Sequence, residues 1–351
     1  MGEHGCERVL RMGVLGCADI ALRRMLPVIA AHESARIVAV ASRDSAKAAL
    51  VSDRFGCSAV TGYQRLLDRD DIDAVYIPVP PGLHHEWVVR ALEAGKHVLA
   101  EKPLCTAYEE AVDLMRLARR LGLVLAENFM FLHHSQHATV RSLVEDGTIG
   151  ELQVFSSSFG VPPLDPASFR YRPDLGGGAL LDVGVYPLRA AQLLLGPELE
   201  VRAATLRIDE ATGVDVAGSV LLSTPDCVSA QLDFGFQHSY RCSYALWGSR
   251  GRISVDRAFT PPEQIKPLVR VQQQDRYTEL AVAADHQVRN ALGAFVDAVL
   301  SGAGGPLAED ETLLQARLVS DVRGAAKVAL VKGHSRQRPT ASGPRATAAG
   351  Q

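Results

Sequence analysis

The sequence predicts an α/β protein: an N-terminal Rossmann domain, with a doubly wound parallel sheet, precedes a C-terminal α+β domain with a large, mostly antiparallel, open-faced sheet. Two observations predict this division. Up to about residue 128, short apolar runs alternate with helical patterns, as in parallel strands joined by crossover helices. From Val201 to Val255, apolar and polar residues alternate instead, which is typical of an antiparallel sheet that buries one face.

The composition limits the classes of function that the protein can have. The chain has 351 residues, 47% of them hydrophobic and 22% charged, which is enough for two domains. The formal net charge of -3 and the lack of a basic stripe argue against nucleic-acid binding. No apolar run reaches the roughly 18 residues that span a bilayer, no signal-peptide pattern is present, and the six cysteines form no Cys-x-x-Cys pair. We therefore expect a cytoplasmic protein with a small-molecule ligand and no membrane partner.

The first predicted strand, Val9 to Leu15, runs into small residues and then into a helix from about Ile20. Gly16 permits a tight turn, the small Ala18 lets the backbone approach phosphates, and the helix amides point at them, as dinucleotide binding requires. The usual fingerprint has a glycine in place of Ala18, so a purely structural turn stays an alternative. The candidate pyrophosphate contacts are Gly16, Cys17, Ala18, Asp19 and Ile20.

The second strand, Arg36 to Ala41, ends in Ser42 and Arg43 rather than directly in an acid. A hydroxyl and a guanidinium suit the 2'-phosphate of NADP, whereas NAD enzymes place a carboxylate there. Lys47, one turn into the next helix, adds a second positive candidate. Asp44 is either a late ribose ligand or the N-cap of that helix.

Two further strands end in chemically informative residues. Ala74 to Ile77 opens into a proline-rich loop whose candidate cofactor contacts are Pro80 and His84, although a histidine here also fits an ordinary loop residue. A buried strand that begins at His97 ends in Glu101-Lys102-Pro103. Ligands of open α/β sheets bind at this carboxyl edge, so the acid and the base are predicted to form part of a site.

Residues 176–187, Gly-Gly-Gly-Ala-Leu-Leu-Asp-Val-Gly-Val-Tyr-Pro, form the second informative stretch. Three glycines let another backbone or a ligand approach the first turn of an apolar helix closely. Asp182 and Tyr186 share one helical face, and Pro187 is expected to break or kink the helix just beyond Tyr186. The pattern favours a site over a core tyrosine beside an incidental surface acid.

The expected organisation is a dinucleotide-binding domain over residues 1–128, a substrate-binding and oligomerisation domain over 129–308, and a disordered tail over 332–351. A closing helix at about 309–331 is expected to pack back on the first domain. The open sheet face predicts a homo-oligomer, a dimer or tetramer. His133, His134 and His137 have no companion ligands that would make a metal pattern specific, so no metal site is expected.

Three motifs together resemble the glucose-fructose oxidoreductase, inositol dehydrogenase and rhizopine-catabolism family, over nearly the whole chain from Val9 to about Leu330. They are the Gly-x-x-Gly-x-Ala turn at 13–18, Glu101-Lys102-Pro103 and the run 176–187. Tyr186 replaces the histidine of inositol dehydrogenases, which makes the chain similar to the branch with glucose-fructose oxidoreductase, dihydrodiol dehydrogenases and sugar-nucleotide ketoreductases. Within that branch it most resembles the C-3 ketoreductases of dTDP-dideoxysugar biosynthesis.

The resemblance implies NADP(H) as cofactor and hydride transfer from NADPH to the C-3 keto group of a dTDP-linked 3,4-diketo-2,6-dideoxyhexose, in antibiotic deoxysugar biosynthesis. It implies that Lys102 and Tyr186 are catalytic, with either as proton donor, and that Glu101 faces the cofactor ribose. An ammonium beside the phenol should make it a better acid. The implied substrate contacts are Asp182 and Arg170.

Two other functions stay open. One is an NADP-dependent dehydrogenase of a free sugar or a trans-dihydrodiol, and the other is a non-catalytic NADP-binding sensor, since fold does not imply function. A sensor needs no proton donor beside a hydride donor, so Lys102 with Tyr186 favours an enzyme. A nucleotide diphosphate needs positive charge, for which Arg170, Arg172 and Arg189 are candidates, although the first two also fit a solvated loop.

Overall fold

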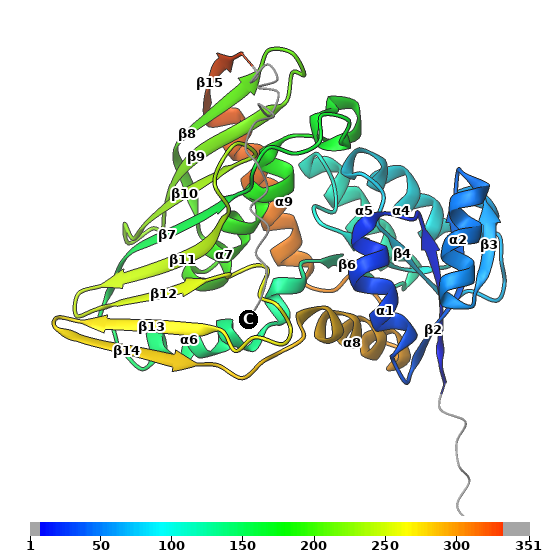
Figure 1. Cartoon of the computed structure of the whole chain (residues 1–351), viewed down its shortest axis with the longest axis horizontal. Helices are drawn as coiled ribbons and strands as arrows, with labels where there is room; N and C mark the ends of the chain where they lie inside the picture. Colours follow the sequence, from blue (N-terminus) through cyan, green and yellow to red (C-terminus); the bar gives the residue numbers. More distant parts are fainter. Residues whose placement is uncertain (1–7, 333–351) are drawn as a thin grey trace, which may run out of the picture.

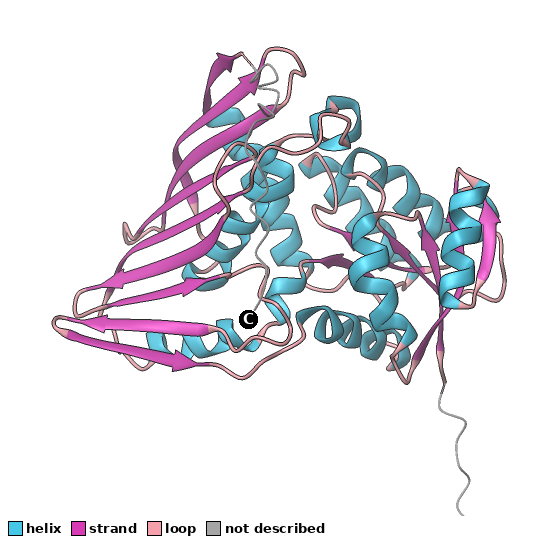
Figure 2. Cartoon of the chain, in the orientation of Figure 1, coloured by secondary structure: helices cyan, strands magenta, loops and turns pink. Residues whose placement is uncertain are grey.

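The computed structural model describes residues 8–332; the expected disordered tail, apart from Lys332, lies outside them. Two sheets organise the chain (Figure 1). The larger sheet stands at the left of the view, and α7 (Val185–Leu195) and α9 (Glu309–Ala325) lie between it and the smaller, N-terminal sheet. Figure 2 shows helices against the smaller sheet and along the inner side of the larger one.

The N-terminal sheet has six parallel strands in the order β3-β2-β1-β4-β5-β6. This order reverses beside β1, which is the arrangement of a doubly wound fold, so the predicted Rossmann sheet is confirmed. The strands are β1 (Leu10–Leu15), β2 (Ala35–Ser42), β3 (Ser58–Thr61), β4 (Ala74–Ile77), β5 (His97–Glu101) and β6 (Leu125–Asn128).

Helices cover both faces of this sheet because its strands are apolar on both sides. Buried residues of α1, α2 and α8 form one core, and those of α3, α4 and α5 form the other. The helix α8 belongs to the segment predicted for the second domain, yet it packs here through Val288, Leu292 and Phe295. These helices are α1 (Leu26–Ala30, after a π-helical turn Ala21–Met25), α2 (Ser45–Phe55), α3 (Tyr63–Leu67), α4 (His84–Glu93), α5 (Tyr108–Leu121) and α8 (Gln287–Leu300).

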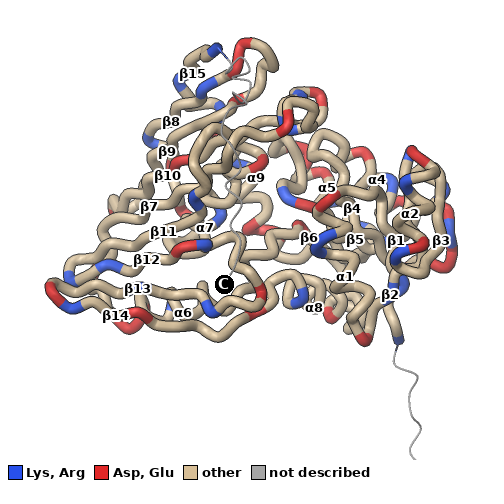
Figure 3. Tube along the Cα trace, viewed as in Figure 1, with Lys and Arg blue, Asp and Glu red and all other residues tan. Residues whose placement is uncertain are grey.

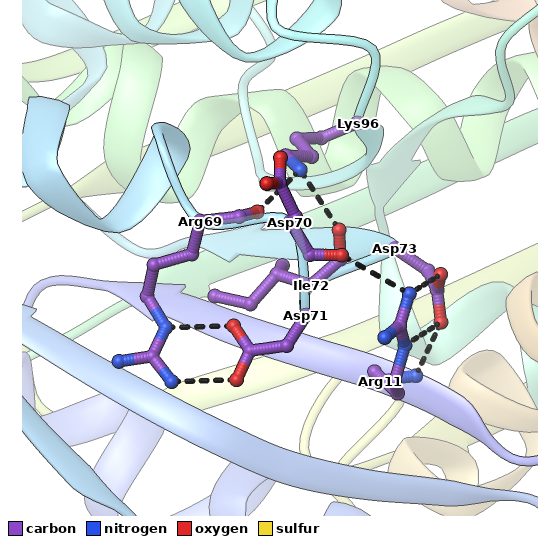
Figure 4. Close-up of polar contacts among 7 residues, drawn as sticks. All are labelled: Arg11, Arg69, Asp70, Asp71, Ile72, Asp73 and Lys96. Atoms are coloured by element: carbon purple, nitrogen blue, oxygen red, sulfur yellow. Dashed lines mark hydrogen bonds and ion pairs between the residues drawn. The ribbon is translucent and has the colours of Figure 1, made fainter.

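A polar network ties down the turn before β4, at the amino end of the sheet (Figure 4). Arg11 of β1 donates to both carboxylate oxygens of Asp73, at 2.8 Å and 3.0 Å. Lys96, only 8% exposed, donates from Nζ to the carbonyls of Arg69 and Ile72. Charge-assisted hydrogen bonds of this kind are stronger than neutral ones. This stabilising network lies at the sheet edge opposite the carboxyl ends of the strands.

The C-terminal sheet has nine strands in the order β14-β13-β12-β11-β7-β10-β9-β8-β15. It is mostly antiparallel, as predicted, with parallel pairs only at β7/β10 and β8/β15. Alternate residues on one face form a third core with α6, α7 and α9. The elements are α6 (Ser135–Glu145), β7 (Leu152–Gly160), β8 (Glu200–Asp209), β9 (Asp215–Ser223), β10 (Ser229–Gly235), β11 (Arg241–Gly248), β12 (Arg252–Asp256), β13 (Leu268–Gln273), β14 (Arg276–Ala281) and β15 (Ala326–Val331).

Two sequence predictions about helices are wrong. The closing helix ends at Ala325, and the next six residues form edge strand β15, parallel to β8; pairing with β8 outweighs the helical pattern there. Pro187 does not break its helix, which continues to Leu195. The proline lies in the first turn of α7, after a π-helical turn at Leu180–Gly184, where a missing N–H is tolerated.

Candidate active site

A cavity of about 440 Å³ lies between the carboxyl edge of the parallel sheet and the C-terminal domain. It brings together predicted residues from four separate stretches of the chain. They are Ala18, Asp19, Ile20, Glu101, Lys102, Arg170, Asp182 and Tyr186. The other lining residues, which the sequence did not single out as site residues, are Pro78, Val79, Pro81, Met130, Phe159, Val161, Leu164, Phe169 and Val183.

The turn after β1 has the backbone that a phosphate site needs. Gly16 adopts a φ of 119°, which disfavours any residue with a Cβ. Cys17 is 6% exposed and packs in the core, so only its backbone is available to a ligand. Helical backbone begins at Asp19, so its first amide groups face the cavity edge.

Hydrogen bonds after β2 decide between the two roles predicted for Asp44, a ribose ligand or a helix N-cap. Its carboxylate accepts from the amides of Ala46 and Lys47 at 2.9 Å and 3.2 Å, so Asp44 is the N-cap of α2. Ser42 is 7% exposed and accepts from the amide of Asp44. Arg43 and Lys47 are exposed and make no ion pair within residues 8–332.

The predicted cofactor contact at His84 is wrong. The side chain is fully buried, and its ring nitrogens lie 2.7 Å from the carbonyl oxygen of Val79 and 2.8 Å from that of Pro103. The imidazole therefore bridges the loops that follow β4 and β5. Pro80 lies in the same loop but does not line the cavity, whereas its neighbours Val79 and Pro81 do.

Glu101 ends β5 within a buried polar network. Its Oε1 accepts from Tyr76 Oη at 2.6 Å and from Asn128 Nδ2 at 2.8 Å. Burial raises the pKa of Glu101, and the two hydrogen bonds oppose that rise. Tyr76 and Asn128 come from the strands on either side of β5. They fix the carboxyl group at the cavity edge, where the predicted ribose contact stays a prediction.

Lys102 spans the two domains. Its Nζ donates to the backbone carbonyl of Asp182 at 2.6 Å and lies 3.2 Å from Asp182 Oδ1. Arg170 Nε donates to the other carboxylate oxygen, Oδ2, at 2.6 Å. Burial alone would raise the pKa of Asp182, but the two cations outweigh it and hold that pKa below its usual value. The aspartate is therefore a carboxylate held between two positive groups.

Tyr186 lies under the ammonium, with Lys102 Nζ 5.0 Å from its ring centroid. Phe129, Phe159 and Phe259 pack around the ring at centroid distances of 5.2 to 5.6 Å. Burial, and then the charges of Glu101 and Asp182, raise its pKa well above the ordinary value for a phenol. The expected acidification by Lys102 is therefore wrong in this state, because burial dominates and the ammonium faces the ring.

The three glycines allow other parts of the chain to pack closely: Gly176 and Gly177 face backbone, and Gly178 faces the carboxylate of Asp215. A Cβ on Gly176 would lie 2.8 Å from the amide nitrogen of Gly82, and one on Gly177 would lie 2.6 Å from the carbonyl oxygen of Arg170. Asp215, which the sequence analysis missed, accepts from the amide of Leu180 at 2.6 Å and so caps the π-helical turn. In the sequence, Asp215 is only an acid at the start of a strand far from the glycine run, so local pattern does not point to this contact.

Two predicted diphosphate candidates and the histidine cluster lie elsewhere. Arg172 is paired with Asp174, and Arg189 is 5% exposed and donates to the carbonyl of Glu311. His137 is buried, with Nδ1 2.9 Å from Tyr244 Oη, and burial lowers its pKa to about 3. Within residues 8–332, no three His, Cys, Asp or Glu residues are grouped to hold a metal.

Comparisons with known proteins agree over both parts of the chain. Residues 10–129 match the oxidoreductase family with an NAD-binding Rossmann fold, and residues 137–254 match the GFO/IDH/MocA C-terminal domain. A dTDP-3,4-didehydro-2,6-dideoxy-alpha-D-glucose 3-reductase of Saccharopolyspora spinosa is 54% identical over 299 residues, which cover 85% of this chain and 90% of that protein.

An enzyme of the same name from Actinomadura kijaniata is 48% identical, over 91% of this chain and 96% of its own. The crystal structure of KijD10, a 3-ketoreductase from that organism in complex with NADP and TDP-benzene, matches with a TM-score of 0.91 and 47% identity. That match covers 92% of this chain and all of the other. The chain therefore belongs to the GFO/IDH/MocA family of oxidoreductases.

Proposed function

We propose that this protein is an NADPH-dependent sugar-nucleotide ketoreductase, which reduces the C-3 keto group of a dTDP-linked 3,4-diketo-2,6-dideoxyhexose in antibiotic deoxysugar biosynthesis. The carrying observation is the meeting of Lys102, Asp182 and Tyr186 in one cavity at the carboxyl edge of the Rossmann sheet. The names of the relatives at about 50% identity support the substrate class.

The residues present fit NADP(H). The positive φ of Gly16 and the helix that begins at Asp19 would hold the pyrophosphate, and Arg43 and Lys47 would bind the 2'-phosphate. Glu101 would contact the nicotinamide ribose. When bound, the cofactor supplies the hydride.

The protein's own residues supply the proton and the position of the carbonyl. The Lys102 ammonium, held by Asp182, donates a hydrogen bond to the reacting oxygen and stabilises the alkoxide that develops there. The Tyr186 hydroxyl is the second contact. Arg170, which Asp182 holds by a hydrogen bond, donates to the neighbouring keto oxygen at C-4, because the diketo sugar has no hydroxyl for the carboxylate to bind. Lys102 is the favoured donor by position, because its ammonium lines the cavity between Asp182 and the face of the Tyr186 ring.

The function is tested by following NADPH oxidation at 340 nm with keto sugars that carry or lack a nucleotide. We expect kcat/KM to be at least about a hundredfold higher for the dTDP-linked 3-keto sugar, because a diphosphate adds charge-assisted contacts. Faster turnover of free sugars or trans-dihydrodiols would favour that alternative. A protein that binds NADPH but oxidises it with neither class would be the sensor.

Replacing Arg43 by alanine is expected to lower kcat/KM for NADPH by about tenfold or more and to leave NADH almost unaffected, since only NADPH carries the 2'-phosphate. Arg54→Ala, at the far end of α2, the helix that follows Arg43, is the matched control. Equal losses with both cofactors would remove Arg43 from the 2'-phosphate site.

We propose that the protein forms a dimer or tetramer through the open face of the nine-stranded sheet. Trp247 is 62% exposed on that face, and Leu221 and Tyr277 are also exposed there. Trp247→Glu should dissociate the oligomer in light scattering at micromolar concentration, because it places a charge in an apolar contact. Leu50→Glu, which places the same charge at an exposed apolar residue of α2, should leave it intact. A wild-type monomer, or an unchanged Trp247→Glu oligomer, would contradict the proposal.

We also propose a cytoplasmic setting. The five cysteines among residues 8–332 are all free thiols, which fits a reducing compartment. No helix in that part of the chain is long and apolar enough to cross a bilayer. Charges of both signs are interspersed along the chain in the view of Figure 3, as expected for a protein without a nucleic-acid surface.

A further inference from the structure

A nucleotide-linked substrate needs a positive group beyond the catalytic end of the cavity, and the arginines predicted from the sequence do not provide a free one. Arg170 is paired with Asp182, Arg172 with Asp174, and Arg189 is buried against α9. If the diphosphate of the proposed substrate is recognised by a guanidinium, that guanidinium must lie elsewhere along the cavity rim.

An aromatic path leads outward from the catalytic residues. The Tyr186 ring lies 5.2 Å from Phe159, which lines the cavity. Phe159 in turn lies 6.5 Å from Tyr240, centroid to centroid and edge to face. Tyr240 is 45% exposed, whereas Phe159 is 6% exposed. The path therefore starts at the buried reacting end and emerges at the surface one ring beyond the cavity.

Arg257 stands at the outer end of this path. Its Cζ lies 5.5 Å from the centroid of the Tyr240 ring, a geometry that holds a guanidinium in place by cation–π attraction. The side chain is exposed and has no carboxylate partner within residues 8–332. Its neighbour Asp256 is paired with Arg270 instead.

Arg257 lies in the turn that directly follows β12. The next two residues, Ala258 and Phe259, are buried in the core, and Phe259 packs against Phe159 and Tyr186, which line the cavity. The backbone φ of Arg257 is 50°, a conformation that favours glycine and is strained for a bulky residue. The turn alone therefore does not explain an arginine here.

We infer that Arg257, held by Tyr240, binds the diphosphate of the nucleotide-linked substrate. A guanidinium matches phosphate oxygens with a planar fork of donors. The exposed edge of Tyr240 offers apolar surface to the attached nucleoside. This inference rests on the proposed function, and it assigns recognition of the nucleotide to the turn after β12 and to the loop between β10 and β11.

The test is binding of dTDP to the NADP⁺-loaded enzyme by isothermal titration calorimetry. Arg257→Gly removes the guanidinium and relieves the backbone strain, so the variant keeps its fold. We expect dTDP to bind the variant at least about tenfold more weakly than the wild type. Arg252→Ala, at the start of β12 and on the open sheet face, is the matched control and should bind like the wild type.

Kinetics give a second readout. Arg257→Gly should raise KM for the dTDP-linked keto sugar by about tenfold at unchanged kcat, and Arg257→Lys should fall between the two because it keeps the charge without the fork. Wild-type binding of dTDP by Arg257→Gly would overturn this inference and leave the proposed function intact. Failure of the wild type to bind dTDP would overturn both.

Discussion

Lys102→Ala is expected to lower kcat for reduction of the dTDP-linked keto sugar by about a hundredfold or more, the scale of losing one acid or one oxyanion donor. Lys102 is the only residue that reaches from β5 to both the carbonyl and the carboxylate of Asp182 within residues 8–332. The change removes a charge-assisted donor to the reacting oxygen. It also leaves Asp182 with Arg170 as its one remaining cation.

The measurement is steady-state NADPH oxidation at saturating substrate, with NADPH binding followed by its fluorescence. Lys47→Ala is the matched control, since it removes an ammonium from the cofactor site and should raise the KM for NADPH without lowering kcat. If correctly folded, cofactor-bound Lys102→Ala kept near-normal turnover, the proton would have to come from Tyr186 or from water.

Tyr186→Phe is expected to lower kcat by about tenfold, less than Lys102→Ala, because it removes one neutral hydroxyl and leaves the charged Lys102 donor in place. The phenyl ring keeps the contacts with Phe129, Phe159 and Phe259, so the variant should retain the thermal stability of the wild type. Tyr76→Phe removes a phenol that donates to Glu101 outside the cavity lining, and comparison with it separates loss of the Tyr186 hydroxyl from a general loss of polarity.

A larger loss for Tyr186→Phe than for Lys102→Ala would reverse the assignment of the proton donor. A shift of the kcat pH profile in Tyr186→Phe, with no shift in Lys102→Ala, would lead to the same conclusion.

The sequence predicted those features that depend on local pattern and on the rule for sheet edges. Buried apolar runs in the sequence predicted β1, β4 and β5. Ala18 and Lys102 follow the carboxyl ends of β1 and β5, and both line the same cavity. The shared helical face of Asp182 and Tyr186 was also confirmed, because four residues make about one helical turn.

Features decided by distant partners were missed or predicted wrongly. His84 was predicted to contact a cofactor, but the carbonyls of Val79 and Pro103 enclose it, and neither contact follows from local spacing. The last six residues of the predicted closing helix form β15 because β8, more than a hundred residues earlier in the chain, offers an open edge. The sequence offered Arg189 as a phosphate ligand, but its guanidinium is buried against α9, where it donates to the carbonyl of Glu311.

The central claim is hydride transfer to C-3 of a nucleotide-linked sugar, and isotope tracing tests it most directly. The enzyme is supplied with NADPH deuterated at C-4 of the nicotinamide, on either face in separate reactions, and with the dTDP-linked 3,4-diketo-2,6-dideoxyhexose. NMR spectroscopy then locates deuterium in the product. The account predicts deuterium at C-3 of the sugar from one of the two NADPH samples, whereas deuterium at another carbon, or in no sugar product at all, would contradict it.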